Sequence, residues 1–497
     1  MLKRCARELS LPTAKLIRRI VSQGFWPSAW TEHWLLPLYK RKAPSDAENY
    51  RAINLTTQIS KVTERFLSQF FLPTLERNFG DGQFAYRKKH GARDALLLYS
   101  LSWIAEMNNG CKVGIYCSDV QGEFDKVEAE LLLQKLSSLG LNGRILEVLR
   151  SWLRNRRGFV IVNGQKSSPM VLRNMVFQGT VWGSCLWNTF FSDCVCALHI
   201  GGFLAIIYAD DCNAFKSYAK QTSNHIILDD LAECQRNLHA WGRANAVTFD
   251  AGKEDTMILS NVEGYGGPVK LLGVEFDNKL IMGTAAHKCS RKAAFKTKSL
   301  LRCRRFYAIN DLVMLYKTHV MSYIEYRTPG IHFASSSVLL EIDDVQARFV
   351  REIGLSEEPA LMTFNLAPLQ VRRDIGILGV IHRAASHNGP PQLWKFFQRI
   401  SSVAAGISRR SRHSLQVSEW STGRDLEIMR RSALGMIRVY NLLPEEVVQE
   451  QDVKGFQTAL TDLVRARIVA QDSRWKLLLS SRHRLFQYHP LVYVDRR

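Results

Sequence analysis

An apolar segment that runs into two adjacent aspartates is the feature that most constrains the fold of this chain. Residues 203–207 read Phe-Leu-Ala-Ile-Ile, and they lead through Tyr208 and Ala209 into Asp210 and Asp211. Polar or small residues and a second apolar stretch follow. Two apolar runs around a polar pair are typical of buried strands joined by a short turn, so we expect a hairpin that presents both carboxylates to a cleft.

A second apolar run, residues 113–116, leads to Asp119. Strands that each end in aspartate are what an enzyme needs if it transfers nucleotides with two divalent cations. The competing interpretation of the aspartate pair is a polar hairpin turn, because Asp is a common turn residue. Further adjacent aspartates at 229–230 and 343–344 lie in stretches with helical spacing, where we expect solvated helix faces.

The composition indicates a basic globular protein. At roughly 150 residues per domain, a chain of 497 residues should form two to four domains. Its 67 Lys and Arg outnumber 46 Asp and Glu, which predicts a polyanionic partner, with nucleic acid first and an anionic membrane surface second. The first ten residues lack the apolar core of a signal peptide, and no apolar run approaches the ~20 residues that span a bilayer. We therefore expect a soluble intracellular protein without a membrane partner.

Apolar spacing predicts helices and strands along the chain. Residues 1–35 are expected to be helical, with tryptophans 26, 30 and 34 as an aromatic core stripe. A helix over residues 60–75 is expected to bury Val62, Phe66, Phe70 and Phe71. The Asn-Gly pair at 163–164 predicts a hairpin, and residues 271–276 predict one strand. From about residue 284 onward we expect mainly helices.

A basic segment opens the helical part of the chain. Residues 287–307 contain no acidic side chain. A solvated helix face usually alternates its signs, so an unrelieved basic run favours a helix that follows a phosphate backbone. The predicted nucleic-acid-binding residues are Lys288, Arg291, Lys292, Lys296, Arg302 and Arg305.

Seven short segments follow one another in a recognisable order. They are residues 49–55 (Asn-Tyr-Arg-Ala-Ile-Asn-Leu), 83–87 with 91–95, 119–125, 177–183, 208–211, Lys253 and 272–273. In this order the chain resembles a reverse transcriptase of the LINE-type (non-LTR, jockey-like) retrotransposon class, most clearly over about residues 25–280. A looser similarity reaches the carboxyl end, where residues 440–448 read Tyr-Asn-Leu-Leu-Pro-Glu-Glu-Val-Val.

The resemblance implies an α/β (α+β) right-hand polymerase with an antiparallel palm sheet. Fingers and an N-terminal helical segment would occupy residues 1–117, and the palm with the remaining fingers elements residues 118–283, with the reverse transcriptase domain over about 30–280. A basic helical thumb would cover 284–355 and a helical carboxyl-terminal region 356–497. The implied partners are an RNA template, a DNA primer and dNTPs, and the implied location is the nucleus. The oligomeric state is left open.

The resemblance also implies the roles of the site residues. Mg²⁺, with Mn²⁺ as a substitute, would be held by Asp119, the carbonyl of Val120, Asp210 and Asp211, with Lys253 protonating the departing pyrophosphate. Residues expected to bind the dNTP are Lys40 and Arg51 at the triphosphate, Phe124 under the sugar, where its ring would exclude a 2′-hydroxyl, and Gln178 and Gly179 in the pocket wall.

Departures from the family pattern keep an alternative open. Glu123 stands where the family usually has alanine, and Ala52 and Ser184 each replace a common proline. None of them removes a metal ligand, yet a decayed relative that only binds RNA or DNA remains the main alternative. An unrelated basic helical protein and a viral RNA-dependent RNA polymerase fit the motifs less well. We expect this chain to be part of a mobile element or a domain separated from one, because the endonuclease domain that usually precedes the polymerase in this family is not recognisable.

Overall fold

The computed structural model describes residues 3–40, 43–400, 412–420, 423–483 and 486–492. The side chains of Glu48 and Glu123 also lie outside the description. The chain divides into two compact units. The first unit comprises residues 1–87, 116–214 and 229–255, and the second comprises 88–115, 215–228 and 256–497.

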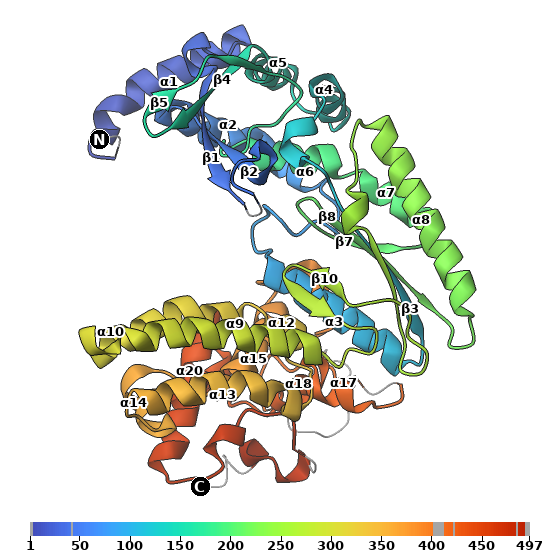
Figure 1. Ribbon diagram of the computed structural model, residues 1–497, viewed down its shortest axis with the longest axis vertical. Coiled ribbons are helices and arrows are strands. Elements are labelled where there is room, and N and C mark those ends of the chain that lie inside the picture. The colour runs from blue at the N-terminus through green and yellow to red at the C-terminus, as the bar shows by residue number, and fades with distance from the viewer. Residues whose placement is uncertain (1–2, 41–42, 401–411, 421–422, 484–485, 493–497) are drawn as a thin grey trace. The chain divides into compact units, whose positions relative to one another are not determined.

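The first unit contains a mixed sheet with the strand order β2-β1-β4-β5, in which β6 also pairs with β4 (Figure 1). The strands are β1 (Glu32–Tyr39), β2 (Tyr50–Leu55), β4 (Arg156–Val162), β5 (Gln165–Lys166) and β6 (Met170–Leu172). β1 runs antiparallel to β2 and parallel to β4. The β4–β5 connection confirms the predicted hairpin, because Asn163 and Gly164 both adopt the positive φ angles that a type I′ turn requires.

Helices and tryptophans fill the core of the first unit. The helices are α1 (Ala6–Gln23), α2 (Gln58–Glu76), α4 (Ala129–Ser138), α5 (Gly143–Leu153), α6 (Gly183–Phe191) and α7 (Cys194–His199). The ring of Trp182 lies 5.2 Å from that of Trp26 and 5.4 Å from that of Trp152. The predicted tryptophan stripe on one helix is wrong, because α1 already ends before Gly24 in a left-handed cap. Trp34 therefore lies on β1, where it is 52% exposed.

Helix α2 turns a different face inward from the one predicted. Phe71 is buried, but Val62, Phe66 and Phe70 are 41%, 44% and 64% exposed. The cause is Glu64, which is buried and accepts hydrogen bonds from the Trp152 indole at 3.2 Å and the backbone N–H of Val181 at 2.7 Å. Burial raises the pKa of this carboxyl group. Because a buried acid needs these partners, the helix face that carries it is fixed toward the core.

A second sheet has the strand order β7-β8-β3-β9. Its strands are β3 (Lys112–Asp119), β7 (Leu204–Tyr208), β8 (Asp211–Tyr218) and β9 (Asp255–Leu259). The division into units passes through β3, β8 and helix α8 (Asn224–Ala244). The expected hairpin is confirmed, since β7 and β8 are neighbours joined by two residues, Ala209 and Asp210.

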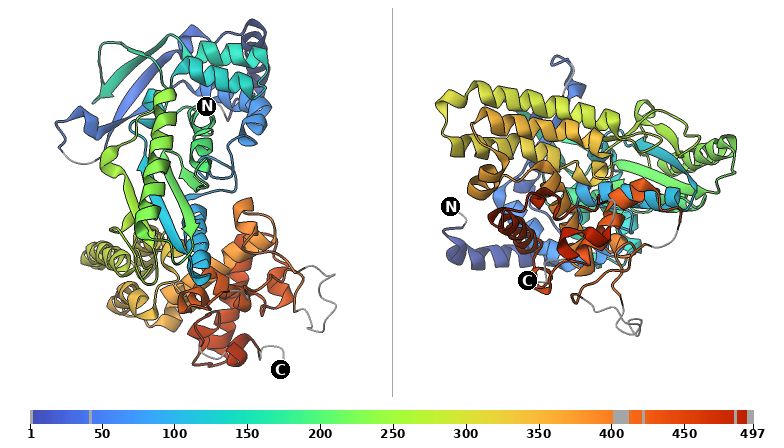
Figure 2. Two further views of the ribbon diagram at one scale, coloured as in Figure 1. Left: turned by 90° about the vertical axis from the view of Figure 1, so that its right-hand side faces the viewer. Right: turned by 90° about the horizontal axis from the view of Figure 1, so that it is seen from below.

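The second unit is mainly helical after residue 283, as predicted. Its longer helices are α3 (Ala92–Asn108), α9 (Gly283–Arg302), α10 (Ile309–Tyr316), α13 (Ser336–Glu352), α14 (Glu357–Phe364), α15 (Leu369–Ala385), α18 (Ala433–Tyr440) and α20 (Val453–Val469). Helices α9 and α13 lie side by side in the front view and in the view from below (Figures 1 and 2).

The strand predicted over residues 271–276 is instead a hairpin of β10 (Val269–Leu271) and β11 (Val274–Phe276). Leu272 and Gly273 both have positive φ angles at its turn. Across the described ranges of the chain, no helix combines the length and the apolarity needed to cross a bilayer.

Candidate active site

Three carboxylates come together where strands of the second sheet end. Asp119 is the last residue of β3, Asp210 lies in the β7–β8 turn, and Asp211 begins β8, the neighbour of β3. Burial, the charges of Asp210 and Asp119, and a hydrogen bond shared with Asp119 raise the pKa of Asp211 to about 7. The structure thus brings the three predicted acids into one site with excess negative charge.

The turn that carries the aspartate pair depends on a strained alanine. Ala209 has a φ of 60°, a left-handed conformation that typically costs a non-glycine residue about 1–3 kcal/mol. The N–H of Ala209 donates a hydrogen bond to the side-chain oxygen of Gln83 at 3.1 Å. The carbonyl of Ala209 accepts one from the Trp187 indole, also at 3.1 Å. These two residues hold the turn. Sequence reasoning missed both roles, since neither residue is close to the aspartates along the chain.

Lys253 lies against the carboxylate of Asp119. It ends the short helix η4 (Ala251–Lys253), whose start is capped by Asp250 through the N–H of Gly252 at 3.2 Å. The ammonium group forms an ion pair with Asp119 and a second one, at 3.4 Å, with Asp250. Burial lowers the pKa of Lys253, but the hydrogen bond and charge of Asp119, helped by Asp250, outweigh it and raise the pKa overall. Lys253 is therefore protonated at neutral pH.

The donors fit a divalent cation by their chemistry, although they are not arranged as a ready-made site. Among the described residues, no three or more His, Cys, Asp or Glu side chains are grouped so that they could hold a metal ion. The Lys253 ammonium instead balances part of the negative charge at Asp119. Carboxylate and carbonyl oxygens are the ligands that Mg²⁺ and Mn²⁺ prefer. Val120, whose carbonyl is the remaining predicted ligand, is buried and forms an isolated antiparallel β-bridge with the backbone of Phe249.

Gln178 and Gly179 form a turn that contacts strand β2. Helix α6 begins only after this turn, at Gly183. The carbonyl of Gln178 accepts hydrogen bonds from the backbone N–H of Asn54 at 2.7 Å and from its amide side chain at 3.1 Å. Gly179 has a φ of 103°, and a Cβ atom there would lie 2.6 Å from the Asn54 carbonyl oxygen. The backbone that approaches this glycine closely is thus β2.

A buried hydrogen-bond chain supports that turn. His33, Asn54 and Arg156 are each at most 1% exposed. The Arg156 guanidinium lies 2.8 Å from Nε2 of His33, and Nδ1 of His33 lies 2.8 Å from Oδ1 of Asn54. Arginine can only donate, so Nε2 accepts and Nδ1 carries the proton that is donated to Asn54. This orientation leaves the Asn54 amide N–H₂ free to bind Gln178. No local pattern in the sequence predicts this chain of contacts.

We expect His33→Phe to lower the free energy of unfolding by about 3 kcal/mol, because it leaves the buried Arg156 and Asn54 groups without their partner. The measurement is urea unfolding followed by the fluorescence of the core tryptophans. His287→Phe is the matched control, since that imidazole is 58% exposed. A loss in His33→Phe no larger than in the control would contradict a structural role for the chain of hydrogen bonds.

The same histidine makes the unfolding free energy depend on pH. Burial and the charge of Arg156 lower the pKa of His33 to about 4, whereas an unfolded chain binds this proton below about pH 6.5. Below pH 6.5 the unfolded state therefore binds a proton that the folded state does not bind. The free energy of unfolding falls as the pH falls toward 4. Between pH 7 and pH 5 we expect this group to cost about 2 kcal/mol. Urea unfolding at both pH values should show that drop in the parent beyond any drop in His33→Phe.

Phe124 lies within an aromatic cluster. It is 4% exposed, and its ring centre is 6.1 Å from that of Trp187 and 6.3 Å from that of Tyr86. Tyr86 is 48% exposed and has a φ of 57°. The exposed ring beside Phe124 is therefore Tyr86, which the sequence did not single out for a role of its own.

Lys40 and Arg51 lie on one face of the β1–β2 hairpin. Arg51 pairs with Leu38 in the strand register, and Lys40 lies two residues after Leu38, on the same side. Burial raises the pKa of Asp125, while the positive charges of Lys40 and Arg51 lower it. Both cations thus act on the segment that follows Asp119, as expected for groups that serve one site.

The structure separates the predicted nucleic-acid-binding residues, which lie on α9 and on the short helix η5 (Arg304–Phe306) after it. Lys288 forms an ion pair with Glu275 at 2.7 Å, and the ammonium groups of Lys292 and Lys296 lie 5.3 and 5.0 Å from the ring centre of Tyr323. The remaining residues of the predicted set are Arg291, Arg302 and Arg305. Arg291 and Arg302 line a groove between α9 and α13, and Arg305 lies over the ring of Phe306. Whether these residues bind nucleic acid stays a prediction.

Residues 40–276 match the family "Reverse transcriptase (RNA-dependent DNA polymerase)". The RNA-directed DNA polymerase from mobile element jockey of Drosophila melanogaster is 26% identical over 371 residues, which cover 69% of this chain and 39% of that protein. A probable RNA-directed DNA polymerase from transposon BS of the same species is 27% identical, over 53% of this chain and 30% of that protein. The chain thus spans about two fifths of the length of the first of these relatives.

Among solved structures, telomerase from Candida albicans with a fragment of telomeric RNA aligns with a TM-score of 0.41 and 13% identity, over 68% of this chain and 66% of that one. The family match implies a right-hand polymerase fold of mixed α and β content. Together with the jockey and BS relatives, it identifies residues 40–276 as a reverse transcriptase domain of the LINE (non-LTR retrotransposon) type.

Proposed function

We propose that this chain is an RNA-directed DNA polymerase that adds deoxynucleotides to the 3′-hydroxyl of a primer. The observation that carries the proposal is the gathering of Asp119, Asp210 and Asp211 within the segment that matches the reverse transcriptase family. Phosphoryl transfer asks a protein mainly for positioning and for stabilisation of charge. Carboxylates that draw together around divalent cations would supply both.

Magnesium, with manganese as a substitute, is the proposed cofactor. Asp119, Asp210, Asp211 and the carbonyl of Val120 would hold it. When bound, it would neutralise charge at the attacking and leaving oxygens. The raised pKa of Asp211 supports this assignment, because crowded carboxylates repel one another until a cation lies among them.

The basic side chains around the carboxylates would handle the triphosphate. Lys40 and Arg51 would donate charge-assisted hydrogen bonds to its oxygens. Lys253 is held protonated by Asp119 and Asp250, so its ammonium group is ready to donate a proton to the departing pyrophosphate. These roles divide binding and proton transfer between the β1–β2 hairpin and helix η4.

The aromatic cluster of Phe124, Tyr86 and Trp187 and the Gln178 turn would shape the sugar pocket. Phe124 would form its floor and the exposed ring of Tyr86 one edge, leaving no room for a 2′-hydroxyl. Gln178 and Gly179 would form the wall, held in place by Asn54.

In the proposed right-hand arrangement, residues 1–117 are fingers, 118–283 the palm with the remaining fingers elements, 284–355 the thumb and 356–497 a helical carboxyl-terminal region. The proposed substrates are an RNA template, a DNA primer and dNTPs. Synthesis on genomic DNA would place the protein in the nucleus.

Primer extension tests the proposal. The purified chain is given poly(rA), an oligo(dT) primer and dTTP, with Mg²⁺ or with Mn²⁺. Primer extension that requires the cation would support the proposed polymerase activity. Duplex binding that is indifferent to the cation, with no extension in either metal, would instead identify a decayed relative that only binds nucleic acid.

A further inference from the structure

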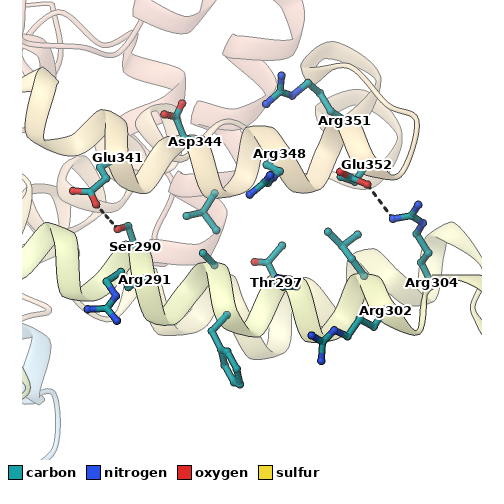
Figure 3. Close-up of a pocket in the computed structure, with 15 residues that line it drawn as sticks. Ser290, Arg291, Thr297, Arg302, Arg304, Glu341, Asp344, Arg348, Arg351 and Glu352 are labelled. Atoms are coloured by element: carbon teal, nitrogen blue, oxygen red, sulfur yellow. Dashed lines mark hydrogen bonds and ion pairs between the residues drawn. The ribbon is translucent and has the colours of Figure 1, made fainter.

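A long groove lies between helices α9 and α13 of the second unit. Its volume is about 990 Å³, and side chains of both helices line it (Figure 3). At its two ends, Ser290 donates a hydrogen bond to Glu341 at 2.8 Å and Arg304 forms an ion pair with Glu352 at 2.9 Å. These contacts engage the acidic residues at the ends of the groove.

Between those ends the groove is strongly basic. The cationic side chains that line it are Arg291, Lys298 and Arg302 from α9 and Arg348 and Arg351 from α13. None of the five forms an ion pair with a described residue. Asp344 is the remaining carboxylate among the lining residues. Uncompensated cations at this density attract a polyanion.

The spacing of the cations indicates an extended ligand. Arg291, Lys298 and Arg302 recur at the intervals of seven and four residues that place them on one helix face. At 1.5 Å per residue the row is about 16 Å long. A single phosphate would need donors that converge on one point, whereas a row of this length suits charges repeated along a chain.

An exposed aromatic ring lies on the same helix face. Phe295 follows Arg291 by four residues, lines the groove and is 72% exposed. Aromatic rings beside a basic track are stacking platforms for the bases of single-stranded nucleic acid. The bases of a duplex are already stacked on one another, and an acidic peptide has no bases to stack.

We propose that the α9–α13 groove binds an extended single strand of nucleic acid, with its phosphates along the five cations and a base on Phe295. The other lysines of α9 differ from these cations, because Lys288 is paired with Glu275, and Lys292 and Lys296 lie over the ring of Tyr323. The inference adds a second binding site to the proposed polymerase and rests on the proposed function for the class of polyanion.

The test measures binding of a fluorescein-labelled U15 RNA and a dT15 DNA to the full chain by anisotropy between 50 and 300 mM NaCl. The groove variant Lys298→Gln/Arg302→Gln/Arg348→Gln should bind both strands at least tenfold more weakly at 150 mM NaCl. The slope of the logarithm of the binding constant against the logarithm of the NaCl concentration should be less steep by about 2, because three phosphate contacts are lost. Phe295→Ala should weaken binding about tenfold with the slope unchanged.

The matched control is Arg7→Gln/Lys15→Gln/Arg19→Gln on helix α1 of the first unit, which removes the same charge. Equal weakening by both triple variants would show a net-charge effect and overturn the proposal. It would also be overturned if Phe295→Ala bound as the parent does while poly-glutamate competed with U15, since the groove would then suit an acidic protein segment. A parent that binds U15 through the groove yet extends no primer would remove the proposed function and leave this inference standing.

Discussion

Asp210→Asn is expected to reduce primer extension by about 1,000-fold without unfolding the chain. The substitution keeps the shape of the side chain but removes one of three negative charges that surround the proposed cation site. Losing several kcal/mol of transition-state stabilisation at a metal-assisted phosphoryl transfer corresponds to a factor of this size. The measurement is incorporation of dTTP on poly(rA)–oligo(dT) with Mg²⁺ and with Mn²⁺.

Removing this charge should also act on its neighbour. The charge of Asp210 raises the pKa of Asp211, so the variant should relieve part of that repulsion and leave the fold intact or slightly more stable. A variant that loses extension and keeps its unfolding midpoint therefore assigns a chemical role to the carboxylate.

The control is Asp229→Asn, the same change in the aspartate pair of helix α8. It should retain extension within about twofold, because surface substitutions of this kind rarely matter. Full activity of Asp210→Asn would contradict the assignment of the site. If the parent is inactive in both metals, the chain is a decayed relative, and the departure at Glu123 becomes the first position to reverse, by Glu123→Ala.

The carboxylate site could be predicted because its signals are local. An apolar run predicts a strand, and an aspartate at the end of that strand then lies at the edge of the sheet. Asp119, Asp210 and Asp211 are therefore found together as expected. The two-residue β7–β8 turn and the Asn-Gly hairpin after β4 follow from the same short-range rules.

The misplaced elements depend instead on contacts between residues far apart in sequence. The apolar spacing of α2 indicated Phe66 and Phe70 as its buried side, but Glu64 turns the helix because its partners, Trp152 and Val181, lie about a hundred residues away. Likewise, nothing near His33 reveals that Arg156 will donate to it. Spacing along one element cannot report a hydrogen bond that tertiary packing creates.

Gly179 shows a functional prediction whose physical reason changes with the structure. The family resemblance implied a place for Gly179 in the wall of the nucleotide pocket, where a glycine lets the backbone approach a ligand closely. The structure shows that strand β2 already occupies the space where a side chain would begin, with the Asn54 carbonyl oxygen 2.6 Å and the Ile53 Cγ2 atom 3.2 Å from the position of a Cβ atom. The glycine joins the Gln178 turn to the hairpin that carries Lys40 and Arg51.

Gly179→Ala is therefore expected to reduce primer extension at least about 100-fold and to lower the free energy of unfolding by about 3 kcal/mol, because the turn must move away from β2 and loses its hydrogen bonds to Asn54. Primer extension and urea unfolding are the measurements. Gly140→Ala is the matched control, since Gly140 also has a positive φ, 78°, but no atom lies within 4 Å of its Cβ position. The free energy of unfolding of that variant should fall by only about 1 kcal/mol, the cost of a positive φ for alanine, and primer extension should be kept. Equal effects of the two substitutions would mean that backbone conformation alone, rather than contact with β2, makes glycine necessary at this turn.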